Sequence, residues 1–347
     1  MTCSAININD FFFMNTSYSL EPISIVIAVH DQGTAITNNL PHLFNQHYEP
    51  GFEVIVVDES STDETADALK QLKAEHSNLY TTYIPESSHY LSRRKLALTL
   101  GIKAAKNKWV ILMNIDCRPK SEKWLECLAS YLNDDHDAVC PFTSYSDDAP
   151  SYYNYRRIMN WYRQGQRPYR HDGICIAINK QAFMERNGFL KNLRFLRGEY
   201  DFIVNESANA CRLNHPDTIL VQDRPSPKEW RKEQICYIET KKHLERTLFP
   251  RVKFIIDQLF LHLITLAAIT CGAWSLMQQQ LLWCGGALTV LLLLWLIRLF
   301  IDIRKAKLLN VKMGWWKLTL FDYRVIWTNL WVWIHYHTSA SSSFIRN

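Results

Sequence analysis

The sequence predicts an α/β domain built on a mostly parallel sheet, followed by a transmembrane helical hairpin and an interfacial amphipathic helix. Three observations support this prediction. Short apolar runs alternate with helical patterns in the first part of the chain. Two long apolar stretches follow after residue 250, and only three glutamines separate them. A tail rich in tryptophan and in charged residues comes last.

Four apolar runs have the length and the composition of buried strands, namely residues 23–29, 52–57, 80–84 and 109–113. Leu, Ile and Ala recur at helical spacing between them, at residues 35–46, 62–76 and 92–105. Ser61 stands three residues before Glu64, which predicts a capping box for the second of these helices. Continuous apolar strands that alternate with helices indicate βαβ units, whose parallel sheet is covered on both faces.

The two apolar stretches, residues 254–277 and 281–301, are each long enough to cross a hydrocarbon core of about 30 Å. Basic residues flank the pair on both sides and the glutamine turn carries no charge, so both ends are expected in the cytosol. Arg298 lies near the end of the second stretch, where a long side chain can reach the interface. The alternative is a pair of core helices in a soluble protein, although such helices rarely run so long without a polar face.

These features divide the chain into four parts: a tail at 1–20, the α/β domain at 21–245, the hairpin at 250–303 and a final tail at 305–347. Five tryptophans in the final tail alternate with charged residues, which favours a helix in the headgroup layer over a third span. The apolar run at 11–14 is too short for the core of a secretory signal, so we expect the α/β domain in the cytosol.

Composition excludes several classes of protein. The net charge is only +5 and no compact run of Lys and Arg is present, so no nucleic-acid partner is expected. The nine cysteines form no C-x-x-C pair and their number is odd. We therefore expect reduced thiols rather than a zinc site or a disulfide framework.

Polar side chains follow two of the predicted strands. Asp58 begins the segment D-E-S-S-T-D after the second strand, and Asn114 and Asp116 follow the fourth. In parallel α/β sheets, ligands bind at the carboxyl ends of the strands. Residues two apart in an extended segment point the same way, so Asn114 and Asp116 can share a divalent ion that carries phosphate oxygens. Asp58 can bind a nucleobase or a ribose. Helix capping and ordinary turns are the alternative explanations.

A third polar segment contains Glu199, Tyr200 and Asp201 after Gly198. A carboxylate held close to an acceptor hydroxyl can serve as a general base. In an extended loop, Glu199 and Asp201 would face the same way. A pair of solvated surface acids is the alternative.

The order of these segments resembles the family 2 glycosyltransferases with the GT-A fold, over about residues 23–244. The resemblance implies that Asp58 and Glu59 bind the nucleoside of a nucleotide sugar, with Val29 and His30 beside the base. Lys95 stands where the family often places a basic residue near the diphosphate.

The same resemblance implies a metal motif. Asn114 and Asp116 occupy the place of the D-x-D sequence, which implies Mg²⁺ or Mn²⁺ on the donor diphosphate. This sequence departs from the pattern because an amide replaces the first acid. It departs again at Tyr200, which stands at the usual base position, so that Asp201 or Glu199 is left for this role. We prefer Asp201, because Glu199 matches the acid that supports the base.

Trp230 and the seven residues after it match poorly to the Q-x-x-R-W signature of processive synthases. The resemblance therefore implies an inverting enzyme that adds one sugar, with Tyr200 and Trp230 near the acceptor. The expected partners are a nucleotide-sugar donor, a glycan or lipid-linked acceptor and membrane lipid, at the cytosolic face of a bacterial inner membrane. Two alternatives stay open: transfer to polyprenyl phosphate, and an inactive membrane scaffold suggested by Asn114 and Tyr200.

Overall fold

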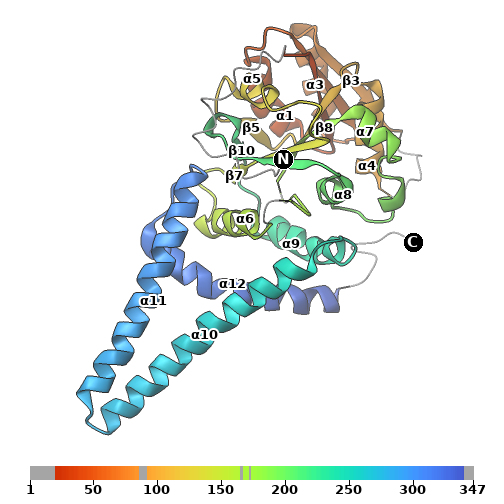
Figure 1. The fold of residues 1–347 in the computed structure, drawn as a ribbon. Coiled ribbons are helices and arrows are strands. Elements are labelled where there is room, and N and C mark those ends of the chain that lie inside the picture. Colours follow the sequence, from red (N-terminus) through yellow and green to blue (C-terminus); the bar gives the residue numbers. More distant parts are fainter. Residues whose placement is uncertain (1–19, 86–91, 165–166, 172, 340–347) are drawn as a thin grey trace.

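The structure is a computed structural model that describes residues 20–85, 92–164, 167–171 and 173–339. An α/β domain occupies one end of the molecule, and two long helices project from its underside (Figure 1). Nearly all of the predicted tail 1–20 and the last eight residues of the tail 305–347 lie outside the described residues.

The central sheet has seven strands in the order β3-β2-β1-β4-β8-β6-β9. These strands are β1 (Ile23–Val29), β2 (Phe52–Asp58), β3 (Leu79–Tyr83), β4 (Trp109–Met113), β6 (Ala138–Pro141), β8 (Cys175–Asn179) and β9 (Ala210–Leu213). All pairs are parallel except those of β8, which runs antiparallel to β4 and β6. The predicted α/β class and its mostly parallel sheet are confirmed.

A second sheet of three strands, in the order β5-β10-β7, lies beside the first. Its strands are β5 (Cys117–Pro119), β7 (Thr143–Tyr145) and β10 (Leu220–Gln222). The helices of the domain are α1 (Gly33–Asn39), α2 (Pro41–Phe44), α3 (Thr65–Glu75), α4 (Arg93–Ala104), α5 (Trp124–Ala129), α6 (Ser151–Arg163), α7 (Lys180–Glu185), α8 (Glu199–Glu206) and α9 (Pro227–Lys242). Two short 3-10 helices, η2 (Leu190–Asn192) and η3 (Pro216–Thr218), complete it.

The core lies on both faces of the large sheet because the central strands β1 and β4 are buried along their whole length. Along β1, Ile25 and Ile27 pack into one buried cluster, whereas Val26 and Ala28 pack into the other. Helix α4 covers the second face. It approaches β1 closely at Gly101, where an added Cβ would lie 2.3 Å from a methyl carbon of Val26.

Two local predictions are corrected. The helix expected at 35–46 is divided into α1 and α2 because Pro41 begins a new helix there. The capping box expected at Ser61 is absent, since α3 begins at Thr65 without a side-chain cap. The Ser61 hydroxyl instead donates to Asp58, and Asp63 bridges the backbone N–H groups of Gly33 and Thr65.

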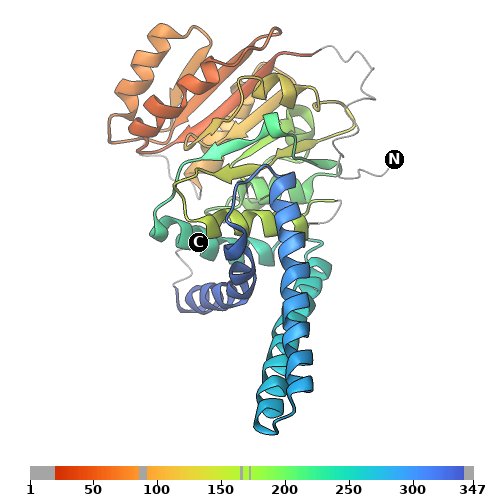
Figure 2. The same ribbon diagram turned by 90° about the vertical axis from the view of Figure 1, so that its left-hand side faces the viewer.

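Three long helices follow the domain: α10 (Leu248–Met277), α11 (Leu281–Leu308) and α12 (Trp315–Thr338). Among the described residues, α10 and α11 are long and apolar enough to cross a membrane, and most of both apolar stretches is exposed. This exposure argues against the alternative of two soluble core helices. Helix α12 lies beneath the domain and beside the hairpin, as Figure 2 shows.

A polar link joins these three helices. Arg298 of α11 forms ion pairs of 2.7 Å with Asp257 of α10 and with Asp322 of α12. Gln258 donates a further hydrogen bond to Asp322. The expected extension of Arg298 toward the interface is therefore replaced by pairing between helices, which satisfies charges that are costly to leave alone in an apolar setting.

We predict that Gly101→Val destabilises the protein by about 1–3 kcal/mol, because a side chain there overpacks the contact between α4 and β1. Thermal unfolding of the full chain in detergent measures the change. Leu100→Val is the matched control, since Leu100 is an exposed residue of the same helix. Equal stability of the two variants would show that the α4–β1 contact is not tight.

Candidate functional site

The carboxyl ends of β1, β2 and β4 bring the first group of predicted residues together. Val29 pairs with Asp58 across the strands, and the backbone N–H of Glu59 donates to the Val29 carbonyl at 2.8 Å. Asp58 accepts hydrogen bonds from the backbone and the hydroxyl of Ser61 through one carboxylate oxygen. His30 follows β1 and is exposed, and its Nε2 lies 3.6 Å from a carboxylate oxygen of Asp31.

Arg94, the second residue of α4, occupies the middle of the site. Its guanidinium donates a hydrogen bond to the side-chain oxygen of Asn114, and its Nε lies 3.7 Å from Oε1 of Glu199. The Tyr200 hydroxyl donates to the same Asn114 oxygen at 2.9 Å. The Arg94 guanidinium thus connects the segment after β4 with the start of α8.

The charges around Arg94 favour its protonated form. Burial lowers the pKa of Arg94, but the surrounding groups of Tyr200, Glu199, Glu59 and Asp116 raise it by more. Burial also raises the pKa of Glu59, against the opposing effect of Arg94. Several acids therefore share one permanent positive charge.

One carboxylate oxygen of Asp116 accepts a hydrogen bond, whereas the other has no hydrogen-bond partner among the described residues. Its Oδ2 accepts a hydrogen bond of 2.7 Å from Gln222, whereas Oδ1 is buried and has no hydrogen-bond partner among the described residues. Burial raises the pKa of Asp116. The backbone N–H of Asp223 donates to the Asp116 carbonyl, while the Asp223 carboxylate accepts from Asn39 and Arg118.

Of the two residues predicted to bind a divalent ion, only Asp116 has an oxygen atom available for it. Asn114 was expected to share the ion, but its oxygen already accepts from Arg94 and Tyr200. Asp116 keeps an unpaired carboxylate oxygen of the kind that hard cations prefer. Mg²⁺ commonly binds through one or two carboxylates together with substrate phosphates and water. The residues present fit an ion that is held chiefly by the phosphates of a ligand.

The two predicted acids of α8 point in different directions. The helix begins at Glu199, and residues two apart on a helix do not face each other. Glu199 faces Arg94, and its Oε1 is buried without a hydrogen-bond partner among the described residues. Asp201 is fully buried and accepts hydrogen bonds from the His171 backbone and from Thr240. Our preference for Asp201 as the base is therefore not supported by its position.

Two other predicted residues lie apart from this group. Lys95 is buried, and its ammonium donates to the backbone carbonyls of Asn192 and Phe195. Burial lowers the pKa of Lys95 to about 8. Trp230 is buried as well, and it stacks on Tyr153 with ring centres 4.3 Å apart. These positions suit structural roles better than the expected contacts with diphosphate and acceptor.

Arg94, Gln222 and Asp223 also belong to the site but were not among the residues predicted from the sequence. A signal for Arg94 existed in the helical spacing of residues 93–95, because Lys95 lies on the buried stripe of α4 that includes Leu98. This helical spacing places Lys95 inside and leaves its neighbour Arg94 at the end of the sheet. The sequence has no comparable signal for Gln222, which ends the short strand β10, or for Asp223, which follows it.

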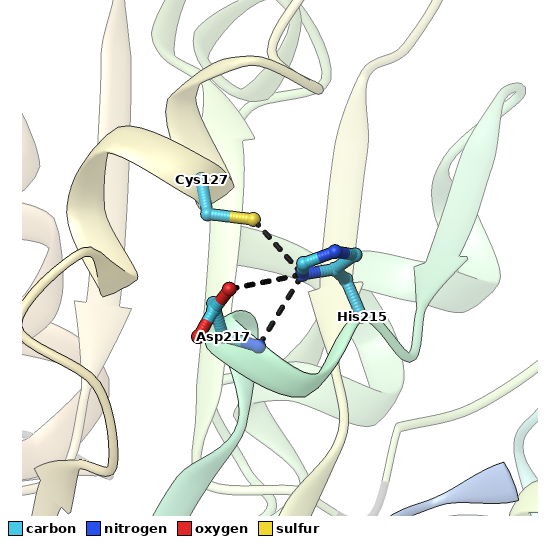
Figure 3. Close-up of side chains that lie close together, drawn as sticks. All are labelled: Cys127, His215 and Asp217. Carbon is cyan, nitrogen blue, oxygen red and sulfur yellow. Dashed lines mark hydrogen bonds and ion pairs between the residues drawn. The ribbon is translucent and has the colours of Figure 1, made fainter. Parts of the chain in front are cut away.

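A separate cluster contains Cys127 of α5 with His215 and Asp217 at η3 (Figure 3). The thiol lies 3.1 Å from Nδ1 of His215, and the same nitrogen accepts the backbone N–H of Asp217 at 3.3 Å. Nδ1 thus caps a helix start, and a sulfur and nitrogen donor set suits softer ions than Mg²⁺ or Mn²⁺. The cluster is not a second candidate for the predicted metal.

Comparison with known families agrees with this geometry. The family model described as glycosyl transferase family 2 matches residues 24–192. These residues form a glycosyl transferase family 2 domain. The match includes the ends of β1, β2 and β4, so the predicted resemblance is confirmed and the chain is a glycosyltransferase.

Solved structures extend the likeness beyond the family 2 domain. Mannosyltransferase PcManGT from Pyrobaculum calidifontis, in complex with GDP-Man and Mn²⁺, is 15% identical, with a TM-score of 0.52 over 93% of each chain. S. aureus TarS 1-349 in complex with UDP-GlcNAc is 14% identical, with a TM-score of 0.44 over 62% of this chain and 64% of TarS. The likeness to PcManGT shows a shared fold. No curated protein sequence matches the chain.

We predict that Arg94→Met lowers the free energy of unfolding by about 1–3 kcal/mol, because it leaves buried acceptors without their positive partner. Glu199→Gln in the same chain should recover part of the loss, with a coupling of about 0.5–3 kcal/mol. Denaturation of both single variants and of the double variant measures this coupling. Strictly additive losses would show that the two side chains do not interact.

Proposed function

We propose that this glycosyltransferase moves one sugar, with inversion, from a nucleotide-diphosphate sugar to an acceptor at the cytosolic face of a bacterial inner membrane. The observation that carries the proposal is the unpaired carboxylate oxygen of Asp116 beside Arg94, at the carboxyl ends of the parallel strands. Ligands of such sheets bind at this edge.

The nucleoside would bind at the ends of β1 and β2. Asp58 would accept hydrogen bonds from the base or ribose through the oxygen that Ser61 leaves free, with Glu59 beside it. The backbone at Val29 and His30 would flank the base. The turn at Ser60, whose φ of 62° is left-handed, supports this role because it fixes the two acids at the end of β2.

The diphosphate would lie between Asp116 and Arg94. A divalent ion, Mg²⁺ or Mn²⁺, would bind Asp116 Oδ1 and stabilise the leaving diphosphate as a Lewis acid. Arg94 would give up part of its contact with the acids and bind phosphate oxygens, for which a guanidinium is well suited. In this proposal Arg94 takes the role expected of Lys95, and Asn114 orients Arg94 rather than the ion.

Glu199 would be the base if the acceptor is a hydroxyl group. Its Oε1 faces the site and has no hydrogen-bond partner among the described residues, so it is available to accept a proton. Tyr200 would orient the acceptor while it holds Asn114. Trp230 is left out of the acceptor site because its indole is stacked inside an aromatic cluster.

The membrane side of the proposal depends on α10 and α11. Their exposed apolar surfaces and the basic residues at both of their outer ends favour a hairpin with the catalytic domain on the cytosolic side. Helix α12 would lie along the headgroup layer. An acceptor embedded in the same membrane would then reach the domain from below.

We predict that Asp116→Asn abolishes the increase in melting temperature that a nucleotide sugar with Mn²⁺ produces in the wild type, since a ligand that binds only the folded state stabilises it. Differential scanning fluorimetry of the full chain, with a panel of nucleotide sugars, measures the shift. Asp217→Asn serves as the control, because Asp217 belongs to the separate Cys127 cluster. An undiminished Mn²⁺-dependent shift in Asp116→Asn would contradict the metal assignment.

We predict that Glu199→Gln lowers kcat by about 10²–10⁴-fold with little change in donor affinity, as expected for a general base. Asp201→Asn should mainly lower stability, because Asp201 holds the backbone of His171 and the hydroxyl of Thr240. Transfer rates and melting temperatures of both variants separate the two effects. A kinetic loss confined to Asp201→Asn would return the role of base to Asp201.

A further inference from the structure

The cluster of Cys127, His215 and Asp217 lies outside the donor site and has no part in the proposed reaction. Its three candidate ligand atoms are a sulfur, a nitrogen and a carboxylate oxygen, and all lie within 4.8 Å of one another. Figure 3 shows that the thiol and the carboxylate approach the same nitrogen of the imidazole ring. Helix α5 supplies the thiol, and the start of η3 supplies the other two groups. Side chains from two separate elements therefore converge on one point.

The distances within the cluster are close to those around a tetrahedral zinc ion. Sγ of Cys127 lies 3.1 Å from Nδ1 of His215, and Oδ2 of Asp217 lies 3.8 Å from the same nitrogen. Bonds of about 2.3 Å from zinc to sulfur and about 2.0–2.2 Å to nitrogen or oxygen would place such atoms about 3.4–3.6 Å apart. Each of the two distances at Nδ1 would therefore need to change by only about half an ångström.

His215 already has the tautomer that a metal ion at Nδ1 requires. Nδ1 accepts the backbone N–H of Asp217 at 3.3 Å, so this nitrogen carries no proton. A neutral imidazole then has its proton on Nε2 and a lone pair on Nδ1, beside the thiol of Cys127. An ion at this point would replace two weak hydrogen bonds with coordination.

A nucleophilic role for the thiol fits the geometry less well. Burial, with the charges of Asp217 and Glu126, raises the pKa of Cys127 to about 12, so the thiol is protonated at neutral pH. The thiol and the Asp217 carboxylate also meet the same imidazole nitrogen, whereas a catalytic triad uses both nitrogens of the ring. The acidic surroundings that oppose a free thiolate favour a bound cation.

The cluster is open to solvent on one side, so an ion can enter. The side chains of His215 and Asp217 are 24% and 46% exposed, and Cys127 is partly exposed. Three protein ligands leave the fourth position of a tetrahedral ion to water. A thiolate together with an imidazole selects zinc over the harder ions Mg²⁺ and Mn²⁺.

We propose that Cys127, His215 and Asp217 bind one Zn²⁺ ion, with water as the fourth ligand, and that this ion ties α5 to η3. The thiol releases its proton to solvent as the bond between zinc and sulfur forms. Cysteine spacing could not indicate this site, because 88 residues separate Cys127 from His215. The site needs neither donor nor acceptor, so it stands or fails separately from the proposed transfer reaction.

The position of the cluster in the fold shows what the ion would stabilise. Strand β5 follows Asp116 and leads toward α5, whereas η3 leads into β10. The two strands pair antiparallel, and Gln222 at the end of β10 donates to Asp116. The ion would therefore close the far end of a strand pair whose other end holds Asp116.

The test uses the full chain in detergent, without a histidine tag, stripped of metal with a chelator and studied without nucleotide. We expect one equivalent of Zn²⁺ to bind and to raise the melting temperature. Co²⁺ in its place should give a charge-transfer band from thiolate to metal, which reports a cysteine ligand. Absence of Zn²⁺ binding, or a Co²⁺ spectrum without this band, would overturn the proposal.

Cys127→Ser should weaken Zn²⁺ binding by more than about 100-fold and remove the Co²⁺ band, since losing even an outer partner of a ligand costs about 10–100-fold. His215→Gln removes the imidazole but keeps the thiol, and it should weaken binding as well. Cys271→Ala, at an exposed cysteine of α10, is the matched control and should bind as the wild type does. Wild-type affinity in Cys127→Ser and His215→Gln, or an equal loss in Cys271→Ala, would contradict the proposal.

Asp116→Asn separates this site from the donor site. In the absence of nucleotide it should bind Zn²⁺ as the wild type does, because Asp116 lies at the other end of the β5–β10 pair. A loss of Zn²⁺ binding in Asp116→Asn equal to that in Cys127→Ser would assign the ion to the donor site and overturn the proposal.

Discussion

The guanidinium of Arg94 lies among acidic groups from three separate elements, and the arrangement of the donor site depends on its position. Glu59 follows the end of β2, Asp116 lies in the segment after β4, and Glu199 begins α8. Without a fixed positive charge, these acids would repel one another and their burial would be costly. Arg94 also holds Asn114, which removes that amide from metal binding. The same guanidinium therefore stabilises these acids and leaves Asp116 as the acid that can bind a cation.

The first turn of α8 places two acids in different surroundings. Glu199 lies beside Arg94, whereas Asp201 is buried in the interior, where it lies 3.7 Å from Arg170. Below it, Arg163 packs on Phe254, and the ion pairs of Arg298 fix the helices α10, α11 and α12 to one another.

The sequence predicted those parts of the fold that have a long apolar signal. The strands at residues 23–29 and 109–113 and the two apolar helices followed from composition alone. The three-stranded sheet had no such signal, because each of its strands has only three residues. In the site, Asp58 and Asp116 were placed by the ends of their strands. The direction of Asp201 could not be predicted, since it depends on where α8 begins, whereas the helical spacing of α4 does place Lys95 on its buried stripe.

The central claim is that Asp116 holds a divalent ion chiefly with the help of ligand phosphates, because Asn114 is occupied and Arg94 is close. Electron paramagnetic resonance of free Mn²⁺, titrated with the full chain, tests this claim most directly. The account predicts that the free Mn²⁺ signal falls only slightly with protein alone and falls strongly once UDP or GDP is added. Tight, stoichiometric binding of Mn²⁺ by the protein without a nucleotide would contradict it.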